Sequence, residues 1–354
     1  MGNENLIKAK KAKNDEFYTQ LSDVDSELSL YVDEDGNSLF KDKIVYCNCD
    51  DCYKSNFFLW FAMNFKKLGL KKLMASCYFE APPPFIKFSF FDPTPEKVEK
   101  KPAYKVEITD IEDYNGNGEI DREDVFYHLA NTDAVSFLKG DGDFRSEECL
   151  ALLDEADVVV TNPPFSLFRD FVATMTAHNK PFAVIGSMNA ITYREVFPLI
   201  RDGIVQTGFN FSRAFTFVTP EEDHTTDSAE EECGEQTLCN IAWFTSLPIR
   251  KPNARIDLVC KYEGNESAYP RYSNYNAIEV SRTADIPFDY KGIMGVPITF
   301  IDKYCPEQFE IIDTMSPEIN GEKVYKRIAI RNRAYNEEVE LIPPKKTAQC
   351  VFDL

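Results

Sequence analysis

Short apolar runs alternate with longer apolar or amphipathic segments from the start of the chain to about residue 205. Apolar runs of roughly four to eight residues between polar turns are typical of buried strands, whereas patterned segments longer than about ten residues are typical of helices. This pattern predicts strands at residues 43–48, 71–78, 104–109, 157–161 and 182–186. It predicts helices at residues 21–31, 55–68, 167–176 and 194–201, and a helical stretch from about 121 to 153.

The order strand, polar turn, helix and strand defines a βαβ unit, which predicts an α/β fold with a doubly wound, mostly parallel sheet. Beyond about residue 205 the alternation ends, and antiparallel strands are predicted at 205–218 and 237–244 around an acidic loop. From about 250 onward, short runs rich in Arg, Tyr, Asn and Pro are more typical of a recognition region than of another half-sheet. We therefore predict a main domain over 1–245, with an insertion at 80–125 and a mobile acidic loop at 219–236, and a target-recognition region over 246–354.

The turn Asn162-Pro163-Pro164-Phe165 directly follows the apolar run 157–161. Two consecutive prolines end a strand and prevent an immediate helix, so a stiff turn is predicted at the carboxyl end of a buried strand, where open α/β sheets place their active sites. The side-chain carbonyl of Asn162 and the main-chain carbonyl of Pro163 are hydrogen-bond acceptors, and the ring of Phe165 offers a stacking face. Two acceptors beside an aromatic ring suit a planar base that carries an exocyclic amine. The alternative is a turn that only ends a strand, with Phe165 in the core.

Residues 50–57 lie where the first βαβ strand turns into its helix. The chain contains neither G-x-G-x-x-G nor G-x-x-x-x-G-K-[ST], so a dinucleotide site or a P-loop is not supported. A pocket for S-adenosylmethionine needs carboxylates for the amino group and the ribose hydroxyls, and apolar walls around the adenine. Asp50 and Asp51 could supply the carboxylates and Phe57 a wall, with Ser55 as the helix N-cap. Alternatively, the carboxylates only stabilise the amino end of the helix.

Residues 113–124 (DYNGNGEIDRED) follow the twelve-residue pattern of an EF-hand calcium loop. Oxygen-bearing side chains fall at loop positions 1, 3, 5 and 9, a glycine falls at position 6, and an aspartate replaces the usual glutamate at position 12. The candidate ligands of a structural calcium ion are Asp113, Asn115, Asn117, Glu119, Asp121 and Asp124. The alternative is an Asx and glycine turn between a strand and a helix that begins near Asp121.

The chain is acidic, with 39 Lys and Arg residues against 59 Asp and Glu residues and a net charge of −20. Proteins that bind nucleic acids usually carry a basic surface instead. The acidic excess is partly local, because residues 221–235 contain eight acidic residues and no Lys or Arg. Two basic clusters stand out, namely Lys8, Lys10, Lys11 and Lys13, and Lys323, Lys326, Arg327, Arg331 and Arg333. Binding of DNA would require both clusters to converge on one face.

Composition and the absence of targeting signals indicate what kind of protein this is and where it acts. An apolar content of 44% with 28 Phe and 17 Tyr supports a sizeable core and argues against global disorder. No apolar run approaches the roughly 20 residues of a membrane span, and the first residues lack an apolar signal core. The ten cysteines are scattered, which is typical of reduced thiols. These observations predict a cytoplasmic enzyme that does not contact a membrane.

Several segments together resemble the EcoRI-type adenine-specific DNA methyltransferases. The segments are 14–19 (NDEFYT), 45–51 (VYCNCDD), 55–57 (SNF), 142–146 (GDFRS), 158–168 (VVVTNPPFSLF), 241–245 (IAWFT) and 294–300 (MGVPITF). The first resembles the methionine-contacting motif of amino-methyltransferases, the next two their first cofactor motif, and the fourth and fifth the central block of the family. The resemblance covers most of the chain.

The resemblance implies a Rossmann-like methyltransferase sheet with a C-terminal target-recognition addition, and an enzyme of restriction–modification type. It implies transfer of a methyl group from S-adenosylmethionine to the N6 amine of an adenine flipped out of duplex DNA. The implied catalytic residues are Asn162, Pro163, Pro164 and Phe165. The implied cofactor-binding residues are Phe17, Tyr18, Thr19, Asn48, Asp50, Asp51, Ser55, Asn56, Phe57, Asp143 and Phe144. The expected partners are S-adenosylmethionine and double-stranded DNA, and a monomer is favoured.

Two alternatives remain open at this point. An Asn-Pro-Pro-aromatic turn also serves methyltransferases that modify an RNA base or a protein amide. The net charge of −20 also fits a catalytically idle acidic decoy of a DNA-binding protein, which would bind basic partners and transfer no methyl group to DNA.

Overall fold

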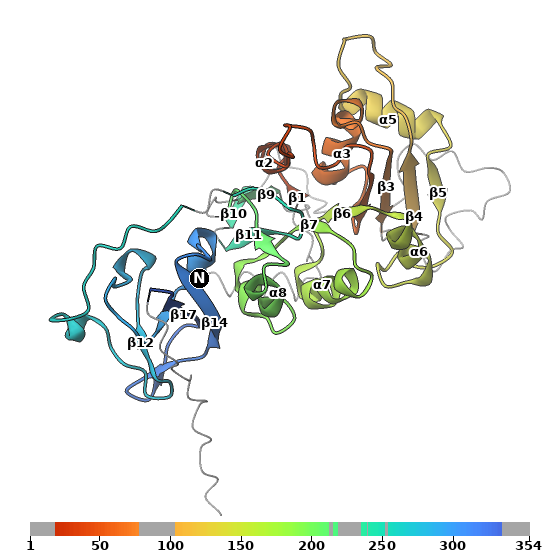
Figure 1. Ribbon diagram of the computed structural model, residues 1–354. Coiled ribbons are helices and arrows are strands. Elements are labelled where there is room, and N and C mark those ends of the chain that lie inside the picture. Colours follow the sequence, from red (N-terminus) through yellow and green to blue (C-terminus); the bar gives the residue numbers. More distant parts are fainter. Residues whose placement is uncertain are drawn as a thin grey trace, which may run out of the picture. The chain divides into compact units, whose positions relative to one another are not determined.

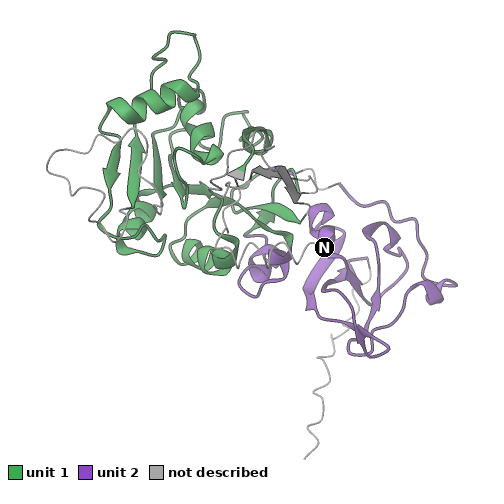
Figure 2. Cartoon of the chain, turned by 180° about the vertical axis from the view of Figure 1, so that it is seen from behind, with its two compact units in different colours: residues 1–188, 205–249 green, residues 189–204, 250–354 purple. Residues whose placement is uncertain are grey.

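A computed structural model describes residues 18–77, 103–211, 215–218, 235–238, 240–251 and 254–334, with backbone alone at residues 18, 215–218 and 235–238. The chain divides into two compact units, one formed by residues 1–188 and 205–249 and the other by residues 189–204 and 250–354 (Figure 2). Several sequence predictions lie outside the described residues: Phe17, the basic cluster from Lys8 to Lys13, residues 80–102 of the insertion and residues 219–234 of the acidic loop.

The first unit is built on an eight-stranded sheet in the order β5-β4-β3-β2-β6-β7-β11-β8. Its strands are β2 (Ile44–Asn48), β3 (Lys72–Cys77), β4 (Tyr104–Ile108), β5 (Val135–Phe137), β6 (Val158–Thr161), β7 (Phe182–Ser187), β8 (Gln206–Thr207) and β11 (Ile241–Thr245). The central pairings β3–β2, β2–β6 and β6–β7 are parallel, and the other four are antiparallel. The α/β prediction is confirmed, but the expectation of a mostly parallel sheet is wrong. Strands join both edges in the antiparallel direction, which needs no helical crossover.

Helices cover both faces of this sheet. They are α2 (Leu21–Leu28), α3 (Asn56–Met63), α4 (Phe65–Leu68), α5 (Arg122–Asn131), α6 (Glu147–Glu155) and α7 (Phe168–Ala177). Figure 1 shows α3 and α5 on one face of the strands and α6 and α7 on the other. Helix α3 is apolar all round, and its six residues from Phe57 to Ala62 are all buried. Burial on every side is what an almost continuous apolar helix requires.

Three predicted helices differ from those observed. The predicted helix at 55–68 is interrupted at Asn64, whose φ of −98° and ψ of 10° leave the α-helical region. The predicted stretch at 121–153 consists of α5 and α6, separated by β5 and by a turn in which Gly142 has a φ of +78°. A positive φ is incompatible with a continuous right-handed helix. The helix predicted at 194–201 is only α8 (Phe197–Arg201), because its proline fits only a first helical turn.

A second, three-stranded antiparallel sheet in the first unit consists of β1 (Tyr18–Thr19), β9 (Phe215–Val218) and β10 (Glu235–Leu238). The pairing of β9 with β10 confirms antiparallel strands on either side of the acidic segment. The prediction for 237–244 combined two strands, because β10 pairs with β9 whereas β11 pairs with β7 in the main sheet.

The second unit has its own four-stranded sheet in the order β12-β13-β17-β14. The strands are β12 (Ala277–Glu279), β13 (Ile293–Val296), β14 (Phe309–Met315) and β17 (Arg327–Asn332), and a hairpin of β15 (Glu318–Ile319) and β16 (Glu322–Lys323) precedes β17. The C-terminal region therefore forms a sheet of its own, which its short apolar runs did not indicate. No helix in the described part of the chain is long and apolar enough to cross a membrane.

Candidate active site

The carboxyl ends of β2 and β6 lie side by side because the two strands are parallel neighbours. Their register pairs Tyr46 with Val159, so the turns that follow the strands leave the sheet at the same edge. The hydroxyl of Thr161, the last residue of β6, donates a hydrogen bond to the main-chain carbonyl of Asn48, the last residue of β2. The predicted catalytic turn and the predicted cofactor turn therefore begin at adjacent, hydrogen-bonded strand ends.

The turn after β6 keeps the shape that its two prolines impose. Pro163 is buried, whereas Asn162, Pro164 and Phe165 are half-buried. Phe165 opens a single 3₁₀ turn, Phe165–Leu167, in which the amide of Leu167 donates to the carbonyl of Pro164 at 2.9 Å. The ring of Phe165 packs against the core along one part and remains exposed along another. A half-exposed ring is what stacking against a planar ligand requires.

The turn after β2 is sharp and buried. Cys49 has a φ of +65°, in the left-handed region that costs a non-glycine residue about 1–2 kcal/mol. This conformation lets the amide of Asp50 donate to the carbonyl of Ser76 on β3 at 3.2 Å. The side chains of Asn48 and Asp50 are 1% and 4% exposed. Burial and the negative charge of Asp50 raise the pKa of the Cys49 thiol.

Two polar atoms in this region fit a bound ligand. Among the described residues, Asn48 Oδ1 and Thr19 Oγ1 are buried without a hydrogen-bond partner. Nearly all buried polar atoms in folded proteins are hydrogen-bonded, so atoms of this kind indicate a partner that binds from outside the chain. The Asn56 side-chain amide donates to the carbonyl of Thr19 at 2.8 Å and ties β1 to the start of α3. Both atoms suit the amino-acid and ribose groups of S-adenosylmethionine.

Three other predicted cofactor residues also shape the turn. Asp51 Oδ1 accepts hydrogen bonds from the amide of Tyr53 at 2.9 Å and from the hydroxyl of Tyr104 at 3.0 Å. Ser55 Oγ accepts from the amide of Phe57 at 3.2 Å, which confirms Ser55 as the N-cap of α3. Phe57 is 2% exposed and belongs to the core. Tyr104 was not predicted as a site residue, because it lies within the predicted insertion at 80–125, whereas the structure places it on β4 of the main sheet.

The predicted central block at 142–146 lies against the end of β3. Gly142 has a φ of +78°, and a Cβ at this position would lie 2.8 Å from the carbonyl oxygen of Cys77. Asp143 is bound by Arg145 through Nη2 at 2.7 Å and Nε at 3.0 Å, which lowers the pKa of the Asp143 carboxyl. Phe144 is buried. The turn after β2, the turn after β6 and the segment 142–146 beside the end of β3 therefore lie at one edge of the sheet.

The loop at 113–124 is a hydrogen-bonded turn. The carboxylate of Asp113 accepts from the amides of Gly116 at 2.7 Å and Gly118 at 2.8 Å. The carboxylate of Asp124 forms a capping box with Asp121, the N-cap of α5. No group of three or more His, Cys, Asp or Glu side chains in the described residues, which include the whole loop, is arranged to hold a metal ion. The structure therefore does not support the calcium prediction and agrees with the alternative of an Asx and glycine turn.

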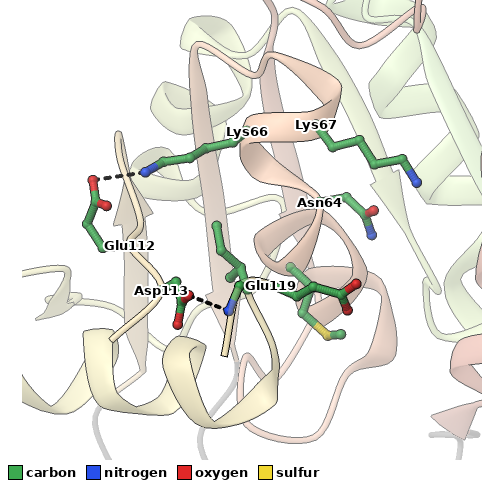
Figure 3. A pocket seen from close by; sticks show the side chains of 9 residues that line it. Asn64, Lys66, Lys67, Glu112, Asp113 and Glu119 are labelled. Atoms are coloured by element: carbon green, nitrogen blue, oxygen red, sulfur yellow. Dashed lines mark hydrogen bonds and ion pairs between the residues drawn. The ribbon is translucent and has the colours of Figure 1, made fainter. Parts of the chain in front are cut away.

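A cavity of about 550 Å³ lies beside this loop, away from the carboxyl edge of the sheet. It is lined by Met63, Asn64, Lys66, Lys67, Glu112, Asp113, Gly118, Glu119 and Ile120. Figure 3 shows Lys66 extending toward Glu112, with which it forms an ion pair at 2.9 Å. This cavity contains none of the residues predicted for catalysis or for S-adenosylmethionine.

A large α/β sheet with an Asn-Pro-Pro-Phe turn joined to a buried polar turn fits the class of S-adenosylmethionine-dependent amino-methyltransferases. The sequence model of the family described as "Adenine-specific methyltransferase EcoRI" matches residues 5–349. The chain is 43% identical over 342 residues to the Type II methyltransferase M.EcoRI of Escherichia coli, covering 94% of this chain and 97% of that protein.

Two mycoplasma proteins are also similar. The chain is 35% identical over 319 residues to the Type II methyltransferase M.MpnI of Mycoplasma pneumoniae, covering 87% of this chain and 85% of that protein. It is 33% identical over 315 residues to M.MgeORF184P of Mycoplasma genitalium, covering 87% and 86%. No solved structure shows significant similarity to the chain. The chain belongs to the EcoRI family of adenine-specific methyltransferases, as the resemblance predicted.

Proposed function

We propose that the turn Asn162-Pro163-Pro164-Phe165 carries out methyl transfer to the N6 amine of adenine. As a member of the EcoRI family, the chain is an S-adenosylmethionine-dependent, adenine-specific DNA methyltransferase. The observation that best supports a catalytic role for this turn is its junction with the Asn48 turn through the hydroxyl of Thr161. Transfer between two bound groups requires that their sites adjoin and are held in a fixed geometry.

The chemistry required of the turn follows from the electronic structure of adenine. Its exocyclic amine is a weak nucleophile because the nitrogen lone pair is delocalised into the ring. The Asn162 side-chain oxygen and the Pro163 carbonyl each accept one N–H bond of the amine. These two acceptors localise the lone pair and stabilise the positive charge that develops on nitrogen, because preorganised dipoles act strongly where charge appears. The half-exposed ring of Phe165 holds the base by stacking.

We propose that the buried side chains at the ends of β1 and β2 hold the cofactor. Bound S-adenosylmethionine supplies an electrophilic methyl group on a sulfonium ion. Asn48 and Thr19 offer buried oxygens to its polar groups, and Asp50 offers a carboxylate to its amino group or ribose. Asp51, Ser55 and Asn56 fix the backbone around the pocket. Of the remaining predicted residues, Phe57, Asp143 and Phe144 complete the pocket on a Rossmann-like sheet. Phe17 and the side chain of Tyr18 lie outside the described residues, and their role stays a prediction from the resemblance.

Family membership also bears on the two alternatives. An adenine-specific methyltransferase does not modify a protein amide, and the three relatives are all named Type II methyltransferases, which favours DNA over an RNA base. An idle acidic decoy is less favoured, because the proposed catalytic turn 162–165 is present and follows a strand end that is hydrogen-bonded to Asn48. We further propose that the protein acts as a monomer in the cytoplasm and that residues 246–354 recognise the target sequence.

Base flipping can be tested by weakening the target base pair. A base inside a duplex cannot reach a pocket at the sheet edge, so the adenine must leave the stack at a cost of a few kcal/mol. In a duplex that the wild-type protein methylates, replacing the thymine opposite the target adenine by a mismatched base should tighten DNA binding about tenfold, because this cost is already met. Affinity is measured by fluorescence anisotropy, with a mismatch several base pairs away as the control. Equal affinities for the three duplexes would contradict flipping.

A further inference from the structure

Within the second basic cluster of the sequence, residues 323–333, the three arginines form ion pairs or hydrogen bonds with other groups of the same unit. Arg327 forms a bidentate ion pair with Glu279, from Nη2 to Oε1 at 2.7 Å and from Nε to Oε2 at 3.1 Å, and Arg331 binds Glu310 at 2.6 Å. Arg333 donates to the main-chain carbonyls of Pro306 and Phe309. These three arginines hold the four-stranded sheet of the second unit together.

The two lysines of this cluster are placed differently. Lys323 and Lys326 are exposed, and neither has an ion-pair partner among the residues that the structure describes. Lys326 makes one long contact, from Nζ to the hydroxyl of Thr192 at 3.5 Å. Between them lies Tyr325, whose side chain is 85% exposed. Tyr325 is thus an exposed aromatic side chain flanked in the sequence by two cations that have no ion-pair partner in the described residues.

These residues are presented on a rigid support. β15 and β16 are joined by Asn320 and Gly321, whose φ values of 54° and 84° are those of a type I′ hairpin turn. Both main-chain polar groups of Glu318 are hydrogen-bonded to residues outside the hairpin. The Glu318 carbonyl accepts from the amide of Ser273 at 2.8 Å, and the Glu318 amide donates to Asn274 Oδ1 at 2.9 Å. The hairpin is therefore fixed to the body of the unit.

The segment 324–326 joins β16 to β17, and its ends are anchored while its middle is exposed. Val324 packs against the small apolar core of the second unit, and its amide donates to the carbonyl of Pro317 at 3.0 Å. Arg327 is held by Glu279, which also accepts a hydrogen bond from the hydroxyl of Tyr272. Val324 and Arg327 thus hold the two ends of the segment, and Tyr325 and Lys326 between them are exposed.

We infer that Lys323, Tyr325 and Lys326, here called the hairpin triad, form a contact surface for duplex DNA. The two lysines bind phosphates on the DNA backbone, and the ring of Tyr325 is an apolar wedge against a base step, a combination used by proteins that deform DNA. The inference rests on the proposed action on duplex DNA and names residues that bind the DNA. In a chain of net charge −20, these two lysines are cations that this surface offers to DNA.

The neighbouring acidic residues provide a matched control. Glu322 adjoins Lys323 in the same strand and is exposed, so Glu322→Gln removes a charge of opposite sign from the same surface. All of these side chains are exposed, and their substitution is expected to leave folding unchanged.

The test is equilibrium binding of the full-length protein to duplex DNA over a range of salt concentrations, with S-adenosylhomocysteine present. The double variant Lys323→Gln, Lys326→Gln should reduce the slope of log K against log salt by about 1.8, because each phosphate contact contributes about 0.9. Tyr325→Ala should weaken binding about tenfold at an unchanged slope. Glu322→Gln should bind DNA at least as tightly as the wild type.

The outcome separates this inference from the proposed function. A wild-type protein that methylates DNA, together with triad variants that bind DNA with wild-type affinity and slope, would overturn the hairpin triad and leave the catalytic proposal intact. A wild-type protein that transfers no methyl group to DNA would instead overturn the proposed function. Unchanged affinity for S-adenosylmethionine in every triad variant is expected, because none of the three residues belongs to the cofactor site.

Discussion

Asn162→Ala should lower kcat at least a hundredfold while the Kd for S-adenosylmethionine stays within about threefold of the wild-type value. The substitution removes one of the two acceptors proposed to act on the adenine amine, and removal of one preorganised hydrogen-bonding group in an active site typically costs about 10²–10³ in kcat. The cofactor is proposed to bind at the neighbouring turn, through Asn48, Thr19 and Asp50, so its affinity should persist. Single-turnover methylation and isothermal titration calorimetry measure the two quantities.

Two variants control for this result. Asn64→Ala removes a half-buried amide whose nitrogen donates to the carbonyl of Trp60 at 2.9 Å, far from the sheet edge, and should leave kcat unchanged. Asn162→Asp retains an oxygen acceptor and should keep more activity than Asn162→Ala. Parallel loss of cofactor affinity and turnover in Asn162→Ala would sink the catalytic assignment, because it would place Asn162 in the cofactor site.

Gly142→Ala should destabilise the protein by about 3 kcal/mol and weaken cofactor binding. Part of this loss is the cost of a positive φ in an alanine, about 1 kcal/mol. The larger part is steric, because the new methyl group would lie 2.7 Å from the Cβ of Ala103 and 2.8 Å from the carbonyl oxygen of Cys77. Overpacking of this kind usually costs about 1–3 kcal/mol. Relief of the clash must move residues 141–145 away from the end of β3, where the predicted Asp143 and Phe144 contacts lie.

Gly36→Ala is the matched control, since Gly36 has a φ of +80° but nothing lies within 4 Å of the position that the new methyl group would take. It should therefore cost only about 1 kcal/mol and leave cofactor affinity unchanged. Urea unfolding gives both free energies, and calorimetry gives both affinities. If the two variants were equally stable, close packing of Gly142 against β3 would be refuted.

The central parallel strands and the two functional turns were predictable from the sequence. Val158–Thr161 is a continuous apolar run, and two prolines end it, so its position and its turn follow from local chemistry alone. Ser55 as a helix cap and the helix that begins after Asp121 were predicted for the same reason.

The sheet edges were not predictable in the same way. β4 pairs with β3 and β11 pairs with β7 across long stretches of chain, and nothing in the local pattern of either strand specifies a partner or a direction. Because the partner of β4 could not be predicted, the hydrogen bond from the Tyr104 hydroxyl to Asp51 was not predicted either. Its position depends on the antiparallel entry of β4.

Local chemistry also bears on two further features of the chain. The pattern of oxygen-bearing residues at 113–124 matched a calcium loop, but the same oxygens also satisfy the loop's own amides, and the capping box of Asp124 and Asp121 is the arrangement observed. In the C-terminal region, Asn320-Gly321 is one of the strongest local indications of a hairpin. It was present in the sequence and marks the hairpin that precedes Tyr325.

The most direct test of the account is the chemical identity of the methylated product. Wild-type protein is incubated with S-[methyl-³H]adenosylmethionine and unmethylated duplex DNA, and the DNA is digested to nucleosides and separated. If the protein methylates the N6 amine of adenine in DNA, the label elutes as N6-methyldeoxyadenosine. Label in a methylated cytosine, or no label in DNA from a protein that binds the cofactor, would contradict it.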